Sequence, residues 1–257
     1  MYKELRKYIV SLLEKGKRND GRTLDQYRDP VTVQYAISET AEGSAQVQIG
    51  DTVVMAGVKL SIEKPFPDTP DQGGIAVNVE LYPLSNPEYE PGPPGIEAVE
   101  LARVVDRGIR ESKAIDMKKL CIEKGEKAWT VGIDIVTIND AGNLFDACSL
   151  AALAALKNTV FPKYEDGELN YKEKTKKKLQ LGKEPVSVTV YKINKSYIVD
   201  PNMDESRVYD ARLSVASTAD GLLSALQKGG ESALTAEDIN IMVDMAVEKA
   251  NFLREKL

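Results

Sequence analysis

Residues 145–158, with the sequence FDACSLAALAALKN, carry small or apolar side chains at nearly every position. Alanine and leucine favour the helix strongly, so the whole stretch is predicted to be helical. Because its apolar residues follow no single stripe, this helix has no face suited to water, and such helices are usually buried on most sides. The fold must therefore cover it with other elements.

Alternation of apolar and polar residues on both sides of this helix predicts strands. The predicted strand segments are 31–38, 43–60, 75–84 and 129–140 in the first half, and 186–193, 196–200 and 211–218 in the second. The stretch 43–60 is expected to be a hairpin, because Gly50-Asp51 is a turn between two β-rich runs. Hairpins favour an antiparallel or mixed sheet over a doubly wound one, and the predicted fold class is α+β.

Amphipathic helices are predicted at both ends of the chain. The first covers residues 3–15, stops at Gly16 and is expected to pack through the stripe Leu5, Ile9, Leu12 and Leu13. The last starts at Thr235, with Asp238 three residues on as in a capping box. Its predicted core-facing stripe is Ile239, Met242, Val243, Ala246, Ala250 and Leu253.

A polar, lysine-rich interval separates the two series of strands and is the best candidate for a linker. We therefore divide the chain into an N-terminal helix and loop (1–28), a first subdomain (29–163), a lysine-rich linker (164–184) and a second subdomain (185–257). The run Lys172–Lys178 could attract nucleic acid, but Glu173 interrupts it, and solvated loop lysines are the commoner explanation.

The absence of histidine from all 257 residues excludes whole classes of chemistry. Serine and cysteine nucleophiles activated by histidine, histidine-ligated zinc and imidazole acid–base catalysis all need that side chain. Cys121 and Cys148 have no CxxC spacing and are expected to be reduced thiols. No apolar run approaches the ~20 residues of a membrane span, and the charged start MYKELRKYIVSLLEKGK is unlike a signal peptide. A cytoplasmic protein is expected.

A helix predicted after the loop PGPPG at 91–95 carries Arg103, Arg107 and Arg110 on one narrow stripe, opposite an apolar face. In a chain of formal net charge −6, such a stripe suggests a local anion site, and phosphate is the first candidate because guanidinium binds it bidentately. Surface ion pairs are the alternative. Glu100, Asp106 and Glu111 lie three or four residues from these arginines, and spacing alone favours the ion pairs.

Several segments resemble the phosphorolytic RNases of the RNase PH superfamily over essentially the whole chain. They are RNDGR at 18–22, GSAQVQIGDTVVMAGVKL at 43–60, and NVELYPLSNPEYEPGPPG leading into ELARVVDRGIRES. Together they are most similar to the non-catalytic ring-subunit branch of the archaeal exosome. The resemblance implies an RNase PH-like fold of two-layer α/β subdomains with mixed or antiparallel sheets, of the ribosomal protein S5 domain 2-like type.

The same resemblance implies partners and a reaction. The ring would hold three heterodimers of this chain with a catalytic RNase PH-like subunit, together with RNA-binding cap subunits. It would degrade RNA from the 3′ end, with inorganic phosphate as a substrate of the complex and nucleoside diphosphates as products.

Departures from the family pattern imply that this chain is not itself catalytic. Catalytic members carry Gly-Ser-Arg or Gly-Thr-Arg at a phosphate-binding turn, where this chain has Gly142-Asn143-Leu144. Ser206 and Arg212 align with two family aspartates, and neither can serve as a carboxylic acid. Asp204, Glu205 and Asp210 lie nearby and are expected to cap turns or to pair with Arg207 and Arg212. We expect no catalytic residue, metal ligand or cofactor in this chain.

By matching positions, the resemblance assigns Arg103 and Arg107 to the sugar-phosphate backbone of the RNA 3′ end. Arg110 is the weaker candidate, because Asp106 can neutralise it. Phosphate contacts fix position without reading sequence, which suits a degrader of any RNA. Two alternatives stay open: a self-sufficient phosphorolytic enzyme that forms a homohexamer and uses Asp204 or Asp210, and a purely structural ring scaffold.

Overall fold

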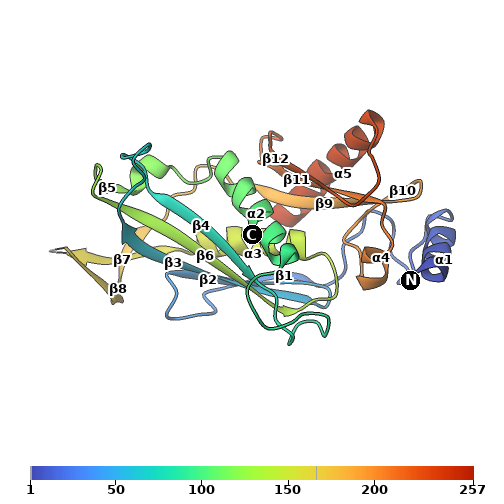
Figure 1. The fold of residues 1–257 in the computed structure, drawn as a ribbon, viewed down its shortest axis with the longest axis horizontal. Coiled ribbons are helices and arrows are strands. Elements are labelled where there is room, and N and C mark those ends of the chain that lie inside the picture. The colour runs from blue at the N-terminus through green and yellow to red at the C-terminus, as the bar shows by residue number, and fades with distance from the viewer. Residues whose placement is uncertain (1, 166) are drawn as a thin grey trace.

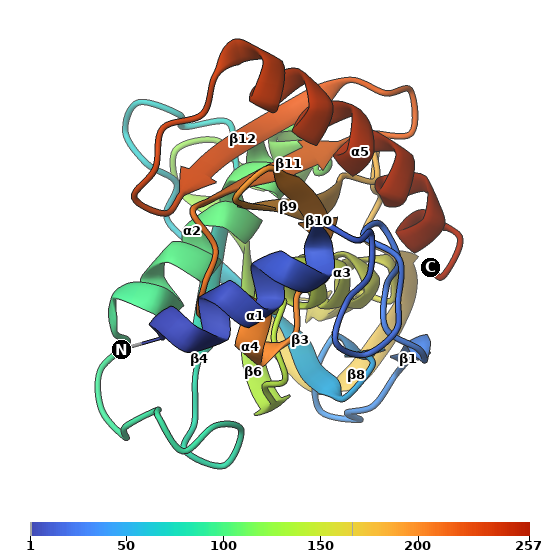
Figure 2. The same cartoon turned by 90° about the vertical axis from the view of Figure 1, so that its right-hand side faces the viewer.

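The computed structural model describes residues 2–165 and 167–257. Two β-sheets enclose a layer of two helices, α2 (Ile96–Glu111) and α3 (Leu144–Lys157), and a further helix, α5 (Ala236–Arg254), covers the outer face of the second sheet. Figures 1 and 2 show this stack from two sides, with the first sheet at the bottom and α5 at the top. The predicted α+β arrangement is confirmed.

The first sheet is mixed and lies under α3. Its order is β1 (Val31–Tyr35), β2 (Gly43–Ile49), β3 (Thr52–Glu63), β6 (Lys127–Asn139), β4 (Gly74–Glu80), with β5 (Cys121–Glu123) also paired to β6. The β4–β6 pair is parallel and the other pairs are antiparallel. The predicted hairpin is the β2–β3 pair, which turns at Gly50-Asp51 as expected.

The second sheet is antiparallel throughout. Its order is β10 (Ser196–Val199), β9 (Val186–Ile193), β11 (Ala211–Ser217), β12 (Leu223–Gly229). The short helix α4 (Met203–Ser206) lies between β10 and β11 in the chain, and a 3-10 turn η1 (Met117–Leu120) precedes β5. Both faces of this sheet carry helices, because α3 packs on β9 from inside and α5 packs on β9 and β11 from outside.

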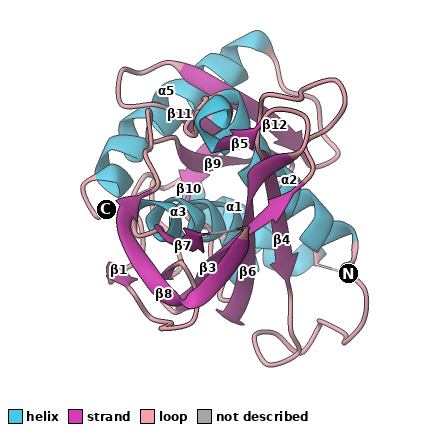
Figure 3. Cartoon of the chain, turned by 90° about the vertical axis from the view of Figure 1, so that its left-hand side faces the viewer, coloured by secondary structure: helices cyan, strands magenta, loops and turns pink. Residues whose placement is uncertain are grey.

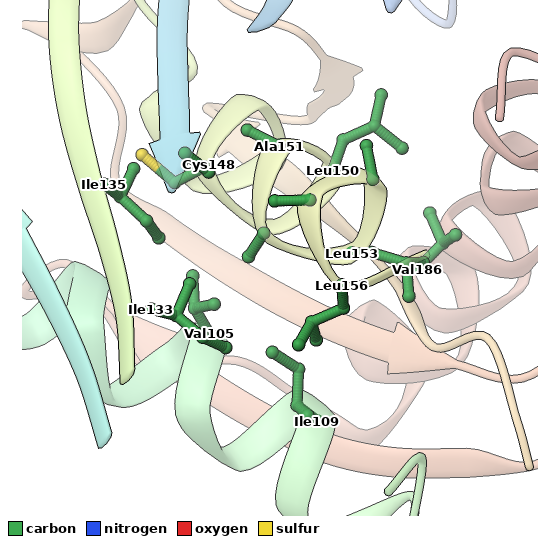
Figure 4. Packing of buried hydrophobic residues seen from close by; sticks show 14 of the residues in the cluster. Val105, Ile109, Ile133, Ile135, Cys148, Leu150, Ala151, Leu153, Leu156 and Val186 are labelled. Atoms are coloured by element: carbon green, nitrogen blue, oxygen red, sulfur yellow. The ribbon is translucent and has the colours of Figure 1, made fainter. Parts of the chain in front are cut away.

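Helix α3 is buried as its composition predicts, with residues 146–156 all buried. Its alanines let neighbouring backbones approach closely, while leucines such as Leu153 and Leu156 fill the space between the layers. Val105 and Ile109 of α2 pack toward this helix (Figure 4). Of the described residues, no helix is long and apolar enough to cross a membrane.

The two terminal helices are present, with one error in a predicted core face. Helix α1 (Lys3–Leu13) docks Ile9 and Leu13 on the second sheet as its stripe predicts. Helix α5 has the predicted capping box between Thr235 and Asp238. Ile239, however, is 37% exposed, so its assignment to the core is wrong. The first turn of α5 is held through Asp238, which accepts hydrogen bonds from Lys192 and Tyr197, and apolar burial starts at Met242.

Most of the lysine-rich interval expected to link the two series of strands is a β-hairpin and not a loop. Strand β7 (Val160–Glu165) pairs with β8 (Glu168–Lys178), and the hairpin extends at the left of Figure 1, on the side that faces the viewer in Figure 3. Asp166 lies outside the described residues. Lys174 fastens the hairpin to the β1–β2 loop by donating to the carbonyl oxygens of Glu39 and Ala41.

Candidate functional site

The arginines of α2 lie on its solvent side, as their spacing predicts. Leu101, Val105 and Ile109 are buried against the core on the opposite face. Arg103, Arg107 and Arg110 are all exposed. The helix starts at the Gly95 N-cap, directly after the exposed Pro/Gly loop that precedes it. One face of α2 therefore holds the helix in place, and the other presents guanidinium groups to solvent.

Only one of the three arginines forms the ion pair that helical spacing suggested. Arg110 pairs with Asp106 at 2.7 Å, and this contact raises the pKa of its guanidinium further. Glu100 pairs with Arg212 at 2.7 Å instead of with Arg103. Within residues 2–165 and 167–257, neither Arg103 nor Arg107 has a carboxylate within 4 Å. The ion-pair explanation therefore holds for Arg110 and leaves two unpaired guanidinium groups one turn apart.

A cavity of about 250 Å³ lies beside the N-terminal end of the same helix. It collects the positions that the resemblance aligned with catalytic residues: the turn Gly142-Asn143-Leu144, Ser206 and Arg212 all line it. These residues come from the start of α3, the end of α4 and the start of β11. Positions that lie far apart in the sequence thus meet in one cavity, as catalytic residues of one active site would.

The side chains in this cavity are unsuited to holding phosphate. Leu144 offers no hydrogen bond, and Arg212 is engaged by Glu100 and stacks over the ring of Phe145 at 4.1 Å. The charged groups that line the cavity are four carboxylates and two guanidinium groups: Glu88, Glu97, Glu100, Asp140, Arg207 and Arg212. Their formal sum is −2. Burial, and then the neighbouring Asp140, Glu100 and Glu88, raise the pKa of Glu97. An anion entering the cavity would meet an excess of negative charge.

Comparison with known proteins identifies the family. The RNase PH domains of the 3′ exoribonuclease family match residues 26–162 (domain 1) and 183–249 (domain 2). The chain belongs to the 3′ exoribonuclease family. Its relatives include the exosome complex component Rrp42 of Methanocella arvoryzae, which is 48% identical over 98% of this chain and 95% of the relative. The corresponding protein of Thermococcus kodakarensis is 44% identical over 98% and 94%.

Solved structures of the family match along almost the full length. One described as the Archaeoglobus fulgidus exosome with RNA bound to the active site superposes with a TM-score of 0.91 at 45% identity, covering 98% of this chain and 97% of that one. An archaeal exosome core gives a TM-score of 0.86 at 43% identity, covering 98% and 96%. The RNase PH-like fold implied by the sequence is therefore confirmed.

The carboxylates near the family's aspartate positions are committed to structural contacts. Glu205 is fully buried, where it accepts from Arg18 Nε at 2.9 Å and closes the capping box of α4. Asp210 pairs with Arg6 at 2.9 Å and accepts from the backbone N–H of Asn194. Asp204 lines a different cavity and, like Asp210, does not line the one described above.

The predicted ion pairs of these carboxylates with Arg207 and Arg212 are therefore wrong. Turn capping is confirmed for Glu205, but its ionic partner is Arg18 and that of Asp210 is Arg6. Arg207 pairs instead with Glu88 at 2.6 Å, and Arg212 with Glu100. Both arginines thus form ion pairs at the cavity with carboxylates from the first half of the chain, which local spacing along the sequence could not indicate.

A buried polar network under the cavity was not foreseen from the sequence. Arg22 and Arg28 both donate to the buried carboxylate of Asp200, and Arg28 also donates to the carbonyl oxygens of Ala141 and Gly142. The amide of Asn143 joins Asp200 to Asp146, with both N···O distances at 3.0 Å. Burial raises the pKa of Asp146 to about 7, although Tyr27, Asn143 and the Thr189 N–H all donate to it. The turn at 141–143 is therefore held rigidly; its sequence signal was the segment RNDGR.

Proposed function

We propose that this chain is a non-catalytic ring subunit of a phosphate-dependent 3′→5′ exoribonuclease complex of the archaeal exosome type. Its full-length similarity to archaeal exosome components supports membership in such a ring. The observation that carries the non-catalytic assignment is the cavity at the family's catalytic positions. It has Leu144 at the phosphate-binding turn, Arg212 at an aspartate position and a surplus of carboxylates.

The proposed contribution of the chain is to complete the partner's active site. Arg103 and Arg107 are exposed, unpaired with any described carboxylate and one helical turn apart, so both can reach adjacent phosphates of an extended RNA 3′ end. Arg110 would contribute less, since Asp106 already neutralises it. Inorganic phosphate would be a substrate of the complex, and any metal would belong to the catalytic RNase PH-like partner.

Two further partners and the location follow from the same proposal. RNA-binding cap subunits would deliver single-stranded RNA to the ring, and the complex would work in the cytoplasm. The rival in which the chain acts alone as a homohexamer is disfavoured, because Asp204 and Asp210 lie outside the cavity. If the chain were purely a structural scaffold of the ring, Arg103 and Arg107 would not contact RNA.

A phosphorolysis assay tests the central assignment. The chain is purified alone and together with its catalytic partner, and each sample is given single-stranded RNA and inorganic phosphate. We expect nucleoside diphosphates from the heteromer and none from the chain alone, whose oligomeric mass is measured in parallel. Turnover by the isolated chain, surviving separation from any partner, would establish the homohexameric enzyme instead.

A further inference from the structure

We propose that the acidic cavity beside the N-terminal end of α2 is a receptor for a basic side chain, in the first place an arginine, of a partner polypeptide. The proposal goes beyond the ring function above and does not depend on whether this chain touches RNA. At the positions where catalytic members of the family bind phosphate, this cavity would bind a cation instead.

The ion pairs in the cavity leave two carboxylates without a cation. Arg207 is taken by Glu88 and Arg212 by Glu100. Among the described residues, Asp140 accepts only from neutral donors, which include the Tyr89 hydroxyl at 2.6 Å and the Gly142 N–H at 2.9 Å.

Glu97 is the second of these carboxylates. It has no cation within 4 Å among the described residues, and burial, followed by the like charges around it, raises its pKa and so disfavours its ionised form. A bound guanidinium would reverse that effect, since its positive charge would lie between carboxylates that now repel one another.

Two side chains buried by more than nine-tenths line the cavity, and each keeps a polar atom without a partner in residues 2–165 and 167–257. The side chain of Arg212 is 6% exposed and its Nη1 has no acceptor, while Asn143 is 3% exposed and its Oδ1 has no donor. Leaving such atoms unpaired is costly. A peptide that carries arginine supplies both kinds of group, because its guanidinium donates and its backbone carbonyl accepts.

The remaining walls suit a flat cation better than a metal ion or an anion. The rings of Tyr89, Phe145, Tyr191 and Tyr209 line the cavity. Guanidinium groups bind the faces of such rings, and Arg212 already stacks on Phe145 in this way. In the described part of the chain, no three carboxylates or cysteines are placed to hold a metal ion. Phosphate is opposed by the formal charge of −2 around the cavity.

The probe for this site is acetyl-arginine methylamide, titrated into the full chain and followed by NMR of the backbone amides. Acetyl-citrulline methylamide, which has nearly the same shape without the charge, and inorganic phosphate serve as comparison ligands. We expect saturable shifts at Leu144 and Phe145 with the arginine probe and much weaker ones with either comparison ligand. Glu97→Gln should weaken binding of the arginine probe roughly threefold to tenfold. Glu97→Lys should abolish binding, because the lysine ammonium would itself occupy the place of the bound cation.

The control is Glu111→Gln, the same change on the same helix at an exposed position away from the cavity, and it should bind the probe like the wild type. Equal binding of the citrulline compound, binding of phosphate at the same residues, or no saturable shift would overturn the proposal; the last result would mean a cavity filled by water only. In the heteromer the probe should be excluded by the partner's own basic side chain, and undiminished binding there would refute occupation by a partner. Since the first titration uses the chain alone, its outcome is independent of the phosphorolysis assay.

Discussion

Replacing Arg103 and Arg107 together by alanine should weaken RNA binding by the assembled heteromer and flatten its salt dependence. Each phosphate contact adds about 0.7 to the slope of log K against log salt for single strands, so the loss of two lowers the slope by about 1.4. Between about 50 and 200 mM salt, binding by the wild type should therefore fall roughly sevenfold more than binding by the double variant. Neither arginine has to break an ion pair with a described residue before it meets a phosphate.

The matched control is Arg110→Ala, which removes the same kind of side chain from the same exposed stripe. Because Arg110 is held by Asp106 and by the carbonyl oxygen of Ile75, its loss should change the slope by well under 0.7. Binding is measured by fluorescence anisotropy with labelled RNA at five salt concentrations, and assembly is checked by mass. A double variant that assembles normally with an unchanged slope would refute RNA contact and leave α2 a scaffold. Equal effects of the double variant and the Arg110 control would show that general charge, and not these two contacts, governs binding.

Three further outcomes are expected. Asp146→Asn should remove a pH dependence of the free energy of unfolding. In the wild type the folded state binds the proton of Asp146 more tightly than the unfolded state, because its pKa is raised to about 7. This proton stabilises the fold fully below about pH 4, and the stabilisation, on the order of 4 kcal/mol, is lost as the pH rises through 7. Urea unfolding of both proteins at pH 5 and pH 7.5 measures it, and parallel curves would contradict the raised pKa. Gly43→Ala should destabilise the chain by about 1–3 kcal/mol in thermal unfolding, because a Cβ there would overlap Thr159 and the α3 backbone; an unchanged melting temperature would count against the tight β2–α3 contact. Exchanging Lys172, Lys176 and Lys178 of β8 for glutamine should leave RNA affinity within about twofold, as expected of solvated lysines, and a large loss would make the hairpin a second RNA surface.

The fold was predicted most accurately where the residues that decide an element lie close together in the sequence. Strand β9 has the bounds that its alternation indicated, and the mostly small and apolar segment at 145–158 is the buried helix α3 to within one residue at each end. Strand β8 was missed because its lysines conceal the alternation. It forms because β7 pairs with it and because Leu169 and Thr175 are partly buried there.

In the candidate site, too, features set by neighbouring residues could be predicted from the sequence, whereas features set by distant residues could not. The exposure of the α2 arginines follows from helical angle alone, whereas their ion pairs do not. Glu100 lies within reach of Arg103 on the helix, yet it turns to Arg212, which the second sheet brings against it. The excess of carboxylates in the cavity likewise becomes visible only when the elements that line it, α2, α3, α4 and β11 among them, are assembled.

Helix α2 carries only carboxylates among the charged groups of its first five residues and its two unpaired arginines further along, and this distribution separates two kinds of partner. Glu97 lies in the first turn, where the helix dipole favours carboxylates, whereas Arg103 lies at the middle of the helix and Arg107 one turn further on. The dipole acts within the terminal turns, so it favours the cation of Arg110 and adds little at Arg103. Any affinity for RNA must come from the guanidinium groups themselves, which is why Arg103 and Arg107 should dominate binding while the neutralised Arg110 does not. The acidic end would in turn repel RNA from the cavity and keep the 3′ end on the partner's side, so the same helix would attract RNA at one place and exclude it from the cavity.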